Sequence, residues 1–288
     1  MSNRLRDQLD EDLVLAPGVW DGLTAVIAEQ AGFSALCASG FAISASLGYP
    51  DAELYTMTEN LHAVRTIREA SSLPLVADID TGYGNAVNAV RTARRFLDAG
   101  VEAVFMEDQE SPKRCPLTTG AALPLLDVTA AAGKIRAVKD TVGDDMMVIA
   151  RTDARGDEAL RRAVAYVEAG ADLIMPVTKT FDTVEEWAAC HAEVGVPLMA
   201  TLTASAWTEK AFTPEVMREI GVGLAILPTQ LLMAVAGVAE RTLSRLARDE
   251  APAQVGEDEG AMAHHRFVDL IGTADVERIQ HTYLPESA

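Results

Sequence analysis

Short apolar segments alternate with longer stretches in which apolar residues recur every three or four positions. The short segments are typical of strands buried on both faces, and the longer stretches are typical of amphipathic helices. Four pairs lie where a helical stretch passes into an apolar segment: Ala31-Gly32, Ala99-Gly100, Ala169-Gly170 and Ile220-Gly221. Because glycine suits the left-handed position that ends a helix, these pairs mark helix-to-strand boundaries.

This alternation predicts eight strands with helices between them. The strands are expected at Val14–Ala16, Ala35–Ala38, Leu75–Asp78, Ala103–Met106, Met147–Ala150, Leu173–Met175, Leu198–Thr201 and Leu224–Leu227. The helices include Leu23–Ala31, Thr58–Glu69, Ala86–Ala99, Ala131–Asp140, Glu158–Ala169, Val184–Glu193 and Pro214–Ile220. Eight such units in about 240 residues predict an α/β fold of the (β/α)8 (TIM) barrel type. A doubly wound open sheet is the rival, but no Gly-x-Gly-x-x-Gly follows the first strand.

The chain beyond the eighth strand does not continue the barrel pattern. A long helix is expected at Leu231–Arg248, an acidic linker at Asp249–Gly260, and two short helices at Met262–Ile271 and Ala274–Tyr283. We therefore expect a barrel domain of residues 1–248 and an acidic linker with a helical tail of residues 249–288. An apolar tail needs a surface to pack on, and a neighbouring subunit is favoured over the chain's own barrel.

Composition narrows the classes of partner. The chain has 288 residues, 49% of them hydrophobic, and a formal net charge of −19, which disfavours nucleic acid and anionic membranes as partners. An anionic small substrate would then need local cations. Cys37, Cys115 and Cys190 are too few and too scattered for a disulfide framework or a zinc site. With a charged Met1–Leu13 and no apolar run of ~18 residues, we expect a soluble, cytoplasmic protein.

The run Asp78-Ile79-Asp80-Thr81-Gly82-Tyr83-Gly84 places two carboxylates at the end of the third predicted strand. Side chains two positions apart on a strand point to the same face, so both acids can meet one cation. The two glycines allow a tight turn before the next helix. Paired carboxylates suit a hard cation such as Mg²⁺. The alternative is that these acids cap the next helix or face solvent.

Polar residues also follow the neighbouring strands, at the end where barrel active sites lie. Ser39-Gly40 follows the second strand, Glu107-Asp108-Gln109 the fourth and Arg151-Thr152-Asp153 the fifth. Acids crowded in this way would raise each other's pKa, and a bound divalent cation is the economical explanation. Beside such a site, Arg151 is expected to bind a carboxylate.

The loop Lys113-Arg114-Cys115 adds a candidate nucleophilic or acid–base group. Its two cations favour the thiolate of Cys115, which a mobile loop can bring to a substrate as acid or base. Cys37 and Cys190, in a predicted strand and helix, are expected to be packing residues.

These motifs resemble the isocitrate lyase / phosphoenolpyruvate mutase superfamily, in its short bacterial branch of methylisocitrate lyase-like and carboxyvinyl-carboxyphosphonate phosphorylmutase-like proteins. The resemblance covers roughly residues 10–245. It is carried by Pro17-Gly18-Val19-Trp20-Asp21, Ser39-Gly40, Gly48-Tyr49-Pro50-Asp51, Asp78-Ile79-Asp80-Thr81-Gly82-Tyr83-Gly84, Glu107-Asp108-Gln109, Pro112-Lys113-Arg114-Cys115 and Arg151-Thr152-Asp153-Ala154.

The resemblance implies a Mg²⁺ ion, with Mn²⁺ as the alternative, and an α-oxo acid or its enolate bound to it. It also implies a loop, Lys113 to Leu117, that closes over the substrate, and a C-terminal helix swapped between subunits of a homotetramer (a dimer of dimers). The implied metal-binding acids, partly through waters, are Asp51, Asp78, Asp80 and Glu107. The implied catalytic residues are Lys113, Arg114, Cys115 and Arg151. The implied substrate-binding residues are Trp20, Ser39, Gly40, Phe41, Asp80, Arg151, Thr178, Thr201 and Thr203.

The sequence departs from the lyase pattern in three places. The signature Lys-Lys/Arg-Cys-Gly-His reads Lys113-Arg114-Cys115-Pro116-Leu117 here, so its glycine and histidine are absent. Lyases carry a glutamate after the sixth strand and an asparagine on the seventh, where this chain has Pro176-Val177-Thr178-Lys179 and Thr201-Leu202-Thr203. These positions would contact the far half of a tricarboxylate, so a tricarboxylate substrate is not expected.

Three functional hypotheses follow. The first is a Mg²⁺-dependent lyase that cleaves a C–C bond of a small 2-hydroxy or 2-oxo dicarboxylic acid through a metal-stabilised enolate, including oxaloacetate decarboxylation, with release of pyruvate or a related α-oxo acid. The second is P–C bond chemistry on a phosphonate by a mutase or hydrolase, although that branch lacks the cysteine and has Glu-Asp-Lys where this chain has Glu107-Asp108-Gln109. The third is a non-catalytic barrel that keeps the metal site.

Overall fold

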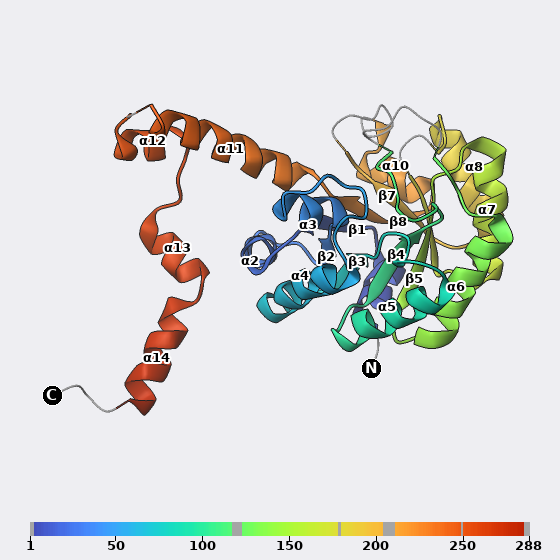
Figure 1. The fold of residues 1–288 in the computed structure, drawn as a ribbon, viewed down its shortest axis with the longest axis horizontal. Helices are drawn as coiled ribbons and strands as arrows, with labels where there is room; N and C mark the ends of the chain where they lie inside the picture. Colours follow the sequence, from blue (N-terminus) through green and yellow to red (C-terminus); the bar gives the residue numbers. More distant parts are fainter. Residues whose placement is uncertain (1–2, 117–122, 178–179, 204–210, 249, 285–288) are drawn as a thin grey trace. The chain divides into compact units, whose positions relative to one another are not determined.

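The computed structural model describes residues 3–116, 123–177, 180–203, 211–248 and 250–284. Eight parallel strands follow one another around a closed barrel (Figure 1). They are β1 (Val14–Val19), β2 (Leu36–Ala38), β3 (Leu75–Asp78), β4 (Ala103–Glu107), β5 (Met147–Thr152), β6 (Leu173–Pro176), β7 (Leu198–Thr201) and β8 (Val222–Leu227). β1 pairs with β8 from Val14 opposite Leu224 to Pro17 opposite Leu227, which closes the sheet. The predicted (β/α)8 barrel is confirmed.

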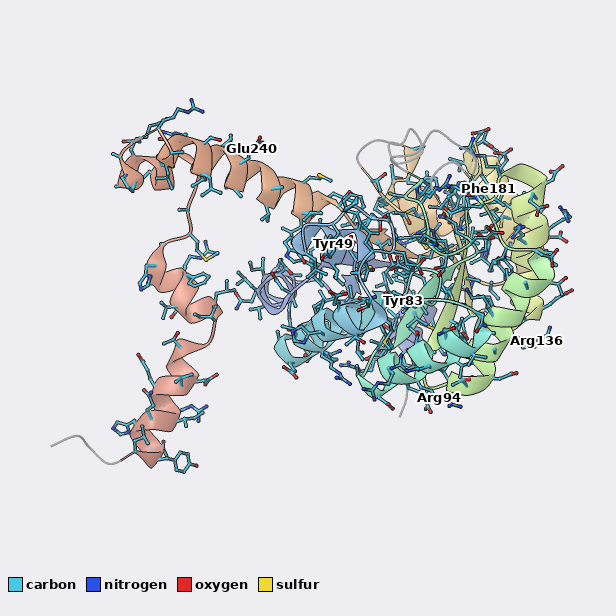
Figure 2. All side chains as sticks on the ribbon, viewed as in Figure 1. Tyr49, Tyr83, Arg94, Arg136, Phe181 and Glu240 are labelled. Atoms are coloured by element: carbon cyan, nitrogen blue, oxygen red, sulfur yellow. The ribbon has the colours of Figure 1, made fainter. Side chains whose placement is uncertain are left out.

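Helices surround the strands as an outer layer (Figure 1). Those of the barrel unit are α2 (Gly22–Gln30), α3 (Gly40–Ser46), α4 (Met57–Ala70), α5 (Ala86–Asp98), α6 (Val128–Val142), α7 (Gly156–Glu168), α8 (Val184–Val194) and α10 (Pro214–Glu219). Capping boxes begin three of them: the N-cap residues of α2, α4 and α8 are Asp21, Thr56 and Thr183. Charged side chains such as Arg94 and Arg136 lie on the outer surface of this layer (Figure 2).

The core has two layers because successive strand residues point to opposite faces. On β3, Val76 packs inside the barrel with residues such as Phe105 and Ile149. Its neighbours Leu75 and Ala77 pack outward against the helices. Both layers are apolar, which explains why the strands read as continuous apolar segments rather than as alternating ones.

An N-terminal helix, α1 (Arg4–Glu11), was not expected from the sequence. Its side-chain pattern is mostly charged, but Leu5 is fully buried and packs with the inner barrel residues. Arg4 pairs with Glu102 at 2.6 Å and Arg6 with Asp172 at 2.9 Å. Glu102 directly precedes β4 and Asp172 directly precedes β6, so α1 covers the amino-terminal end of the barrel.

The second compact unit consists of residues 233–288, so the contacts divide the chain inside α11 (Gln230–Leu246). The sequence pattern places this boundary after Arg248. α13 (His264–Leu270) and α14 (Thr273–Tyr283) match the two expected tail helices.

The acidic segment Asp249–Gly260 is not simply a linker, because α12 (Pro252–Asp258) forms within it. Proline at the first helical position suits the start of a helix. Arg245 of α11 lies 2.7 Å from both Glu250 and Asp258, so the acids pair with α11 rather than facing solvent alone. Among the described residues, no helix is both long enough and apolar enough to cross a membrane.

Candidate active site

Acidic side chains from several strand ends converge on the ammonium of Lys113. Nζ lies 2.8 Å from Asp51 Oδ1 and 2.7 Å from Asp80 Oδ1. The Lys113 side chain is 2% exposed and that of Asp80 is fully buried. Burial opposes the charged form of Lys113, but the charges of Asp80, Glu107 and Asp51 outweigh it and raise the lysine pKa well above its usual value. The loop lysine is therefore a buried cation among the predicted metal ligands.

Arg151 is the second buried cation of the site. It lies opposite Glu107 in the register of β4 and β5, and its Nη1 is 2.7 Å from Glu107 Oε2. Nε and Nη2 donate to the two oxygens of Asp153, at 3.1 and 3.0 Å. A guanidinium has five N–H groups, so these contacts leave two donors for another ligand.

The charges of this centre do not balance. Among the described residues, the carboxylates of Asp51, Asp78, Asp80, Glu107 and Asp153 outnumber the two cations that lie within the cluster, Lys113 and Arg151. Burial raises the pKa of Asp78 to about 7, and it raises that of Glu107 well above its usual value. Asp80 Oδ2 and Glu107 Oε1 have no hydrogen-bond partner among the described residues. An oxygen-only donor set with surplus negative charge fits a hard dication.

The same carboxylates do not form a closed chelate. In the described part of the chain, no three His, Cys, Asp or Glu side chains come together as a direct metal site. The residues therefore fit a metal held by few direct ligands and otherwise through waters, as Mg²⁺ commonly is.

The turn after β3 holds Asp80 in an unusual backbone conformation. Its φ is 48°, in the left-handed region, and its N–H donates to Asp78 Oδ1 at 2.9 Å. Lys134 of α6 donates from Nζ to the carbonyl oxygens of Thr81 and Gly84. These contacts brace the turn from the outer layer and fix both aspartates relative to each other.

Gly40 allows Asp78 to lie close to the chain after β2. A Cβ on Gly40 would lie 2.6 Å from Asp78 Oδ2 and 2.8 Å from Tyr55 Oη. Ser39 does not offer a hydroxyl without partners: it caps α3 by accepting from Ala42 N–H and donates to the Pro228 carbonyl at 3.1 Å.

A cavity of about 60 Å³ opens beside this cluster. Nine of the predicted residues line it: Ser39, Phe41, Asp51, Asp78, Lys113, Cys115, Arg151, Thr201 and Thr203. Its remaining walls include Cys37, Phe105, Met175, Ile226 and Pro228. At about 10–15 Å³ per water-sized group, the cavity suits a ligand of only a few such groups.

Other predicted site residues lie elsewhere. Asp80 and Glu107 are not part of the cavity wall, since Lys113 and Arg151 cover them. Arg114 is exposed, and Trp20 packs against the outer core. Gly40 contributes space rather than a contact. Thr178 is outside the described residues.

The three cysteines are buried in different settings. Cys115 lines the cavity beside Asp51. Burial opposes the charged form of Asp51, but the charge of Lys113 lowers its pKa, and a hydrogen bond with Cys115 contributes to this lowering. Cys190 packs in the outer core, as expected. Cys37 packs inside the barrel but also reaches the cavity, and burial raises the pKa of its thiol well above the usual value.

Two residues that the sequence motif contains, but to which no role was assigned, support the site from outside the cavity. Asp108 accepts hydrogen bonds from the Thr152 hydroxyl and Asp153 N–H, at 2.7 and 3.0 Å, and from Tyr166 at 2.7 Å. Gln109 binds the backbone of Arg114 twice, accepting from its N–H and donating to its carbonyl at 2.9 and 3.0 Å. Both follow Glu107 directly, and their sequence signal was only that adjacency.

Comparison with known proteins adds an independent line of evidence. The phosphoenolpyruvate phosphomutase family model matches residues 5–247. The chain is 39% identical to 2-methylisocitrate lyase of Bacillus subtilis (strain 168) over 234 residues, which are 80% of this chain and 76% of that protein. It is 34% identical to 2,3-dimethylmalate lyase of Eubacterium barkeri over 287 residues, 97% of each chain.

A solved structure agrees in fold, and it was determined with a small dicarboxylate and a metal ion bound. Phosphonopyruvate hydrolase in complex with oxalate and Mg²⁺ superimposes with a TM-score of 0.84 and 32% sequence identity, covering 99% of this chain and 100% of that one. The family match spans the whole barrel, from α1 into α11. The chain therefore belongs to the phosphoenolpyruvate phosphomutase family, within the isocitrate lyase / phosphoenolpyruvate mutase superfamily.

Proposed function

We propose that this protein is a Mg²⁺-dependent lyase that cleaves a C–C bond of a small 2-hydroxy or 2-oxo dicarboxylic acid and releases pyruvate or a related α-oxo acid. One observation carries the proposal: a small cavity lined by Arg151 and Cys115 lies against a buried, surplus-negative carboxylate cluster. The relatives named as lyases, 2-methylisocitrate lyase and 2,3-dimethylmalate lyase, support it.

Asp80 is the proposed direct metal ligand, with Asp51, Asp78 and Glu107 contributing through waters. Mg²⁺ is favoured over Mn²⁺ because a related structure holds it with oxalate. The bound dication would stabilise the negative charge that develops next to a carbonyl when the bond breaks.

The chain's own residues orient the substrate and move its proton. Arg151 retains two N–H donors that can bind a substrate carboxylate in the cavity, while Glu107 and Asp153 hold its plane fixed. Cys115 reaches the same cavity, next to Asp51. We assign it the role of acid or base at the carbon that is released, with Lys113 balancing the charge of Asp51 and Asp80.

The far side of the cavity favours a small, uncharged substituent. In the part of the chain that the structure describes, the buried Thr201 and Thr203 hydroxyls have no hydrogen-bond partner. Met175, Val177 and Ile226 line the same cavity. Such a wall suits a methyl or hydroxyl group better than a third carboxylate. A dimethylmalate-like acid is therefore the first substrate to test, with oxaloacetate as the decarboxylation alternative.

A P–C bond enzyme acting on a phosphonate is the second candidate. The likeness to phosphonopyruvate hydrolase extends over nearly the whole chain, and this favours it. It would use the same Arg151 and the same acids, but it gives Cys115 no assigned role. The two candidates thus differ in the effect of Cys115→Ser.

Pyruvate release decides between them. The enzyme is assayed with Mg²⁺ and 2,3-dimethylmalate, methylisocitrate, oxaloacetate or phosphonopyruvate, coupled to lactate dehydrogenase, with EDTA and enzyme-free blanks. Pyruvate from a C–C substrate, lost in EDTA and in Cys115→Ser, supports the lyase. Turnover of phosphonopyruvate alone supports the second candidate, and metal-independent or absent turnover across the panel contradicts both.

We further propose a homo-oligomer, a dimer of dimers, in which the C-terminal helices exchange between subunits. On α11, an apolar groove is lined by residues that include Val235, Val238 and Leu243. On α14, Val276 and Ile279 are about half exposed, at 54% and 51%. Light scattering of the full chain tests the proposal, and a monomer would contradict it. A cytoplasmic location remains a prediction from the sequence.

A further inference from the structure

Glu53 joins two segments of the site without touching the cavity. Its Oε2 accepts the backbone N–H of Lys113 at 3.0 Å, and its Oε1 accepts the hydroxyl proton of Thr81. Thr81 directly follows Asp80. Glu53 itself lies two residues after Asp51 and has a backbone φ of 52°, in the left-handed region. The carboxylate therefore spans from the loop that carries Lys113 to the turn that carries Asp80.

The segment from Asp51 to Glu53 therefore binds Lys113 at two places, its side-chain ammonium and its backbone N–H. Asp51 binds Nζ at 2.8 Å, and Glu53, two residues later, binds the backbone N–H. The turn after β3 contacts both of these groups: Asp80 binds the Lys113 Nζ at 2.7 Å, and the hydroxyl of Thr81 donates to Glu53. Loss of the Glu53 carboxylate would leave the ammonium contacts but remove the backbone anchor that brings the lysine to them.

We propose that Glu53 is a positioning residue: it ties the backbone of Lys113 to Thr81 and thereby sets the place of the Lys113 ammonium at Asp51 and Asp80. Among the described residues, no other side chain hydrogen-bonds to the Lys113 backbone. Next along the loop, Gln109 anchors only Arg114. The consequence for turnover rests on the proposed function, whereas the position of Lys113 does not.

The shape of Glu53 predicts which replacements keep this role. Glu53→Gln retains one carbonyl oxygen that accepts from the Lys113 N–H. Its amide NH₂ can donate to the Thr81 hydroxyl, which then accepts a hydrogen bond instead of donating one. Glu53→Asp is one methylene shorter and loses one end of the bridge. Glu53→Ala loses both ends. Glu53 is only partly buried, so none of these changes is expected to unfold the barrel.

The primary test measures the accessibility of Lys113 in the metal-free, substrate-free full chain. The protein is briefly acetylated with acetic anhydride, digested with chymotrypsin and quantified by mass spectrometry. In Glu53→Ala and Glu53→Asp, the labelling rate of Lys113 rises about 10-fold or more, because the loop opens more often. In Glu53→Gln, it stays within about 2-fold of the original protein. Lys139, which pairs with Asp172 outside the site, is the internal reference.

Glu110→Ala is the matched control. Glu110 is an exposed glutamate of the same loop, its side chain makes no hydrogen bond or ion pair among the described residues, and its loss changes the net charge equally. Lys113 labelling is expected to be unchanged in this variant. Increased labelling in Glu110→Ala, or unchanged labelling in Glu53→Ala, would overturn the proposal regardless of any activity result.

Turnover supplies the second readout on whichever substrate the panel identifies. In Glu53→Ala, kcat falls about 10- to 100-fold while KM changes less than about 3-fold, because a displaced charge acts mainly on the chemical step. Glu53→Gln restores kcat to within about 3-fold. A kcat loss in Glu53→Gln equal to that in Glu53→Ala would contradict a positioning role. If no substrate is turned over, the proposed function fails while the labelling result still stands.

Discussion

The Lys113 ammonium lies 2.7 Å from Oδ1 of Asp80, the residue proposed to bind the metal directly. The proposed metal ion would therefore share this carboxylate with a cation of the protein. At such distances two positive charges repel by several kcal/mol at an effective dielectric constant of about 20, before relaxation. We therefore expect Lys113 to oppose metal binding, in addition to its proposed part in turnover.

We expect Lys113→Met to bind Mn²⁺ or Mg²⁺ about 10-fold more tightly, since removing the competing charge is worth at least ~1.4 kcal/mol. Its kcat should fall at the same time. Isothermal titration measures the affinity, and Lys139→Met is the control because Lys139 pairs with Asp172 outside the site. Weaker metal binding in Lys113→Met would show that the ammonium supports the metal rather than competing with it.

Gly40→Ala should displace Asp78, because the new Cβ would lie 2.6 Å from its Oδ2. We expect metal affinity and kcat/KM each to fall about 10- to 100-fold, as a shift of about 1 Å commonly costs in a preorganised site. Gly133→Ala is the matched control, since its Cβ would meet no atom within 4 Å and helix propensity favours alanine by about 1 kcal/mol. Normal metal binding in Gly40→Ala would mean that the close approach is not needed.

The metal-free protein should lose stability as pH rises toward neutrality. Burial raises the pKa of Asp78 from 3.8 to about 7, so the folded state keeps a proton that the unfolded chain releases near pH 4. The contribution of this proton to the free energy of unfolding is fully present below about pH 4 and is lost by about pH 7. Between these values the free energy of unfolding falls by at most about 1.4 kcal/mol per pH unit.

Thermal unfolding in EDTA between pH 5 and 7 measures this slope, and Asp78→Asn should flatten it. Equal slopes in both proteins would show that Asp78 does not carry the proton. Conversely, metal affinity should rise with pH up to about 7 because binding must displace that proton.

Thr203→Val should impair catalysis without harming the fold. Among the described residues its buried hydroxyl has no hydrogen-bond partner, so removing it is expected to leave the free energy of unfolding unchanged or to raise it by up to about 1 kcal/mol. If the substrate supplies the missing partner, kcat/KM falls about 10-fold. Thr141→Val, on the outer face of α6, is the control and should leave the kinetics unchanged. Unaltered kinetics in Thr203→Val would remove this hydroxyl from the substrate site.

Local sequence patterns predicted the barrel well because its strands are apolar throughout and its helices are amphipathic. β3 and β7 begin and end where the sequence places them. β4 and β5 run further, to Glu107 and Thr152, because partners on neighbouring strands extend the ladder past the apolar residues. α1 was missed since its mostly charged residues give it little local signal. Leu5 gains its packing only when the barrel exists.

The sequence places Asp78 and Asp80 together at the end of one strand, and the structure does the same. The expected reason, a shared strand face, was wrong, because β3 ends at Asp78 and Asp80 lies in the left-handed turn that follows. The side chains that pair with these acids were not predictable from the sequence. Lys113 was assigned to catalysis from the loop sequence, but that it lies between Asp51 and Asp80 depends on where three distant segments meet. The roles of Asp108 and Glu53 likewise come from tertiary contacts, which no local pattern encodes.

The N-terminal helix has a consequence for how such a protein can evolve. Its ion pairs with Glu102 and Asp172 lie at the amino-terminal end of the barrel strands, whereas the cavity lies at their carboxyl-terminal end. Mutations at the carboxyl-terminal end of the strands therefore leave the stabilising contacts of the N-terminal helix intact. Substitutions in the cavity wall, for example at Pro116, can therefore change the site while the same barrel is retained.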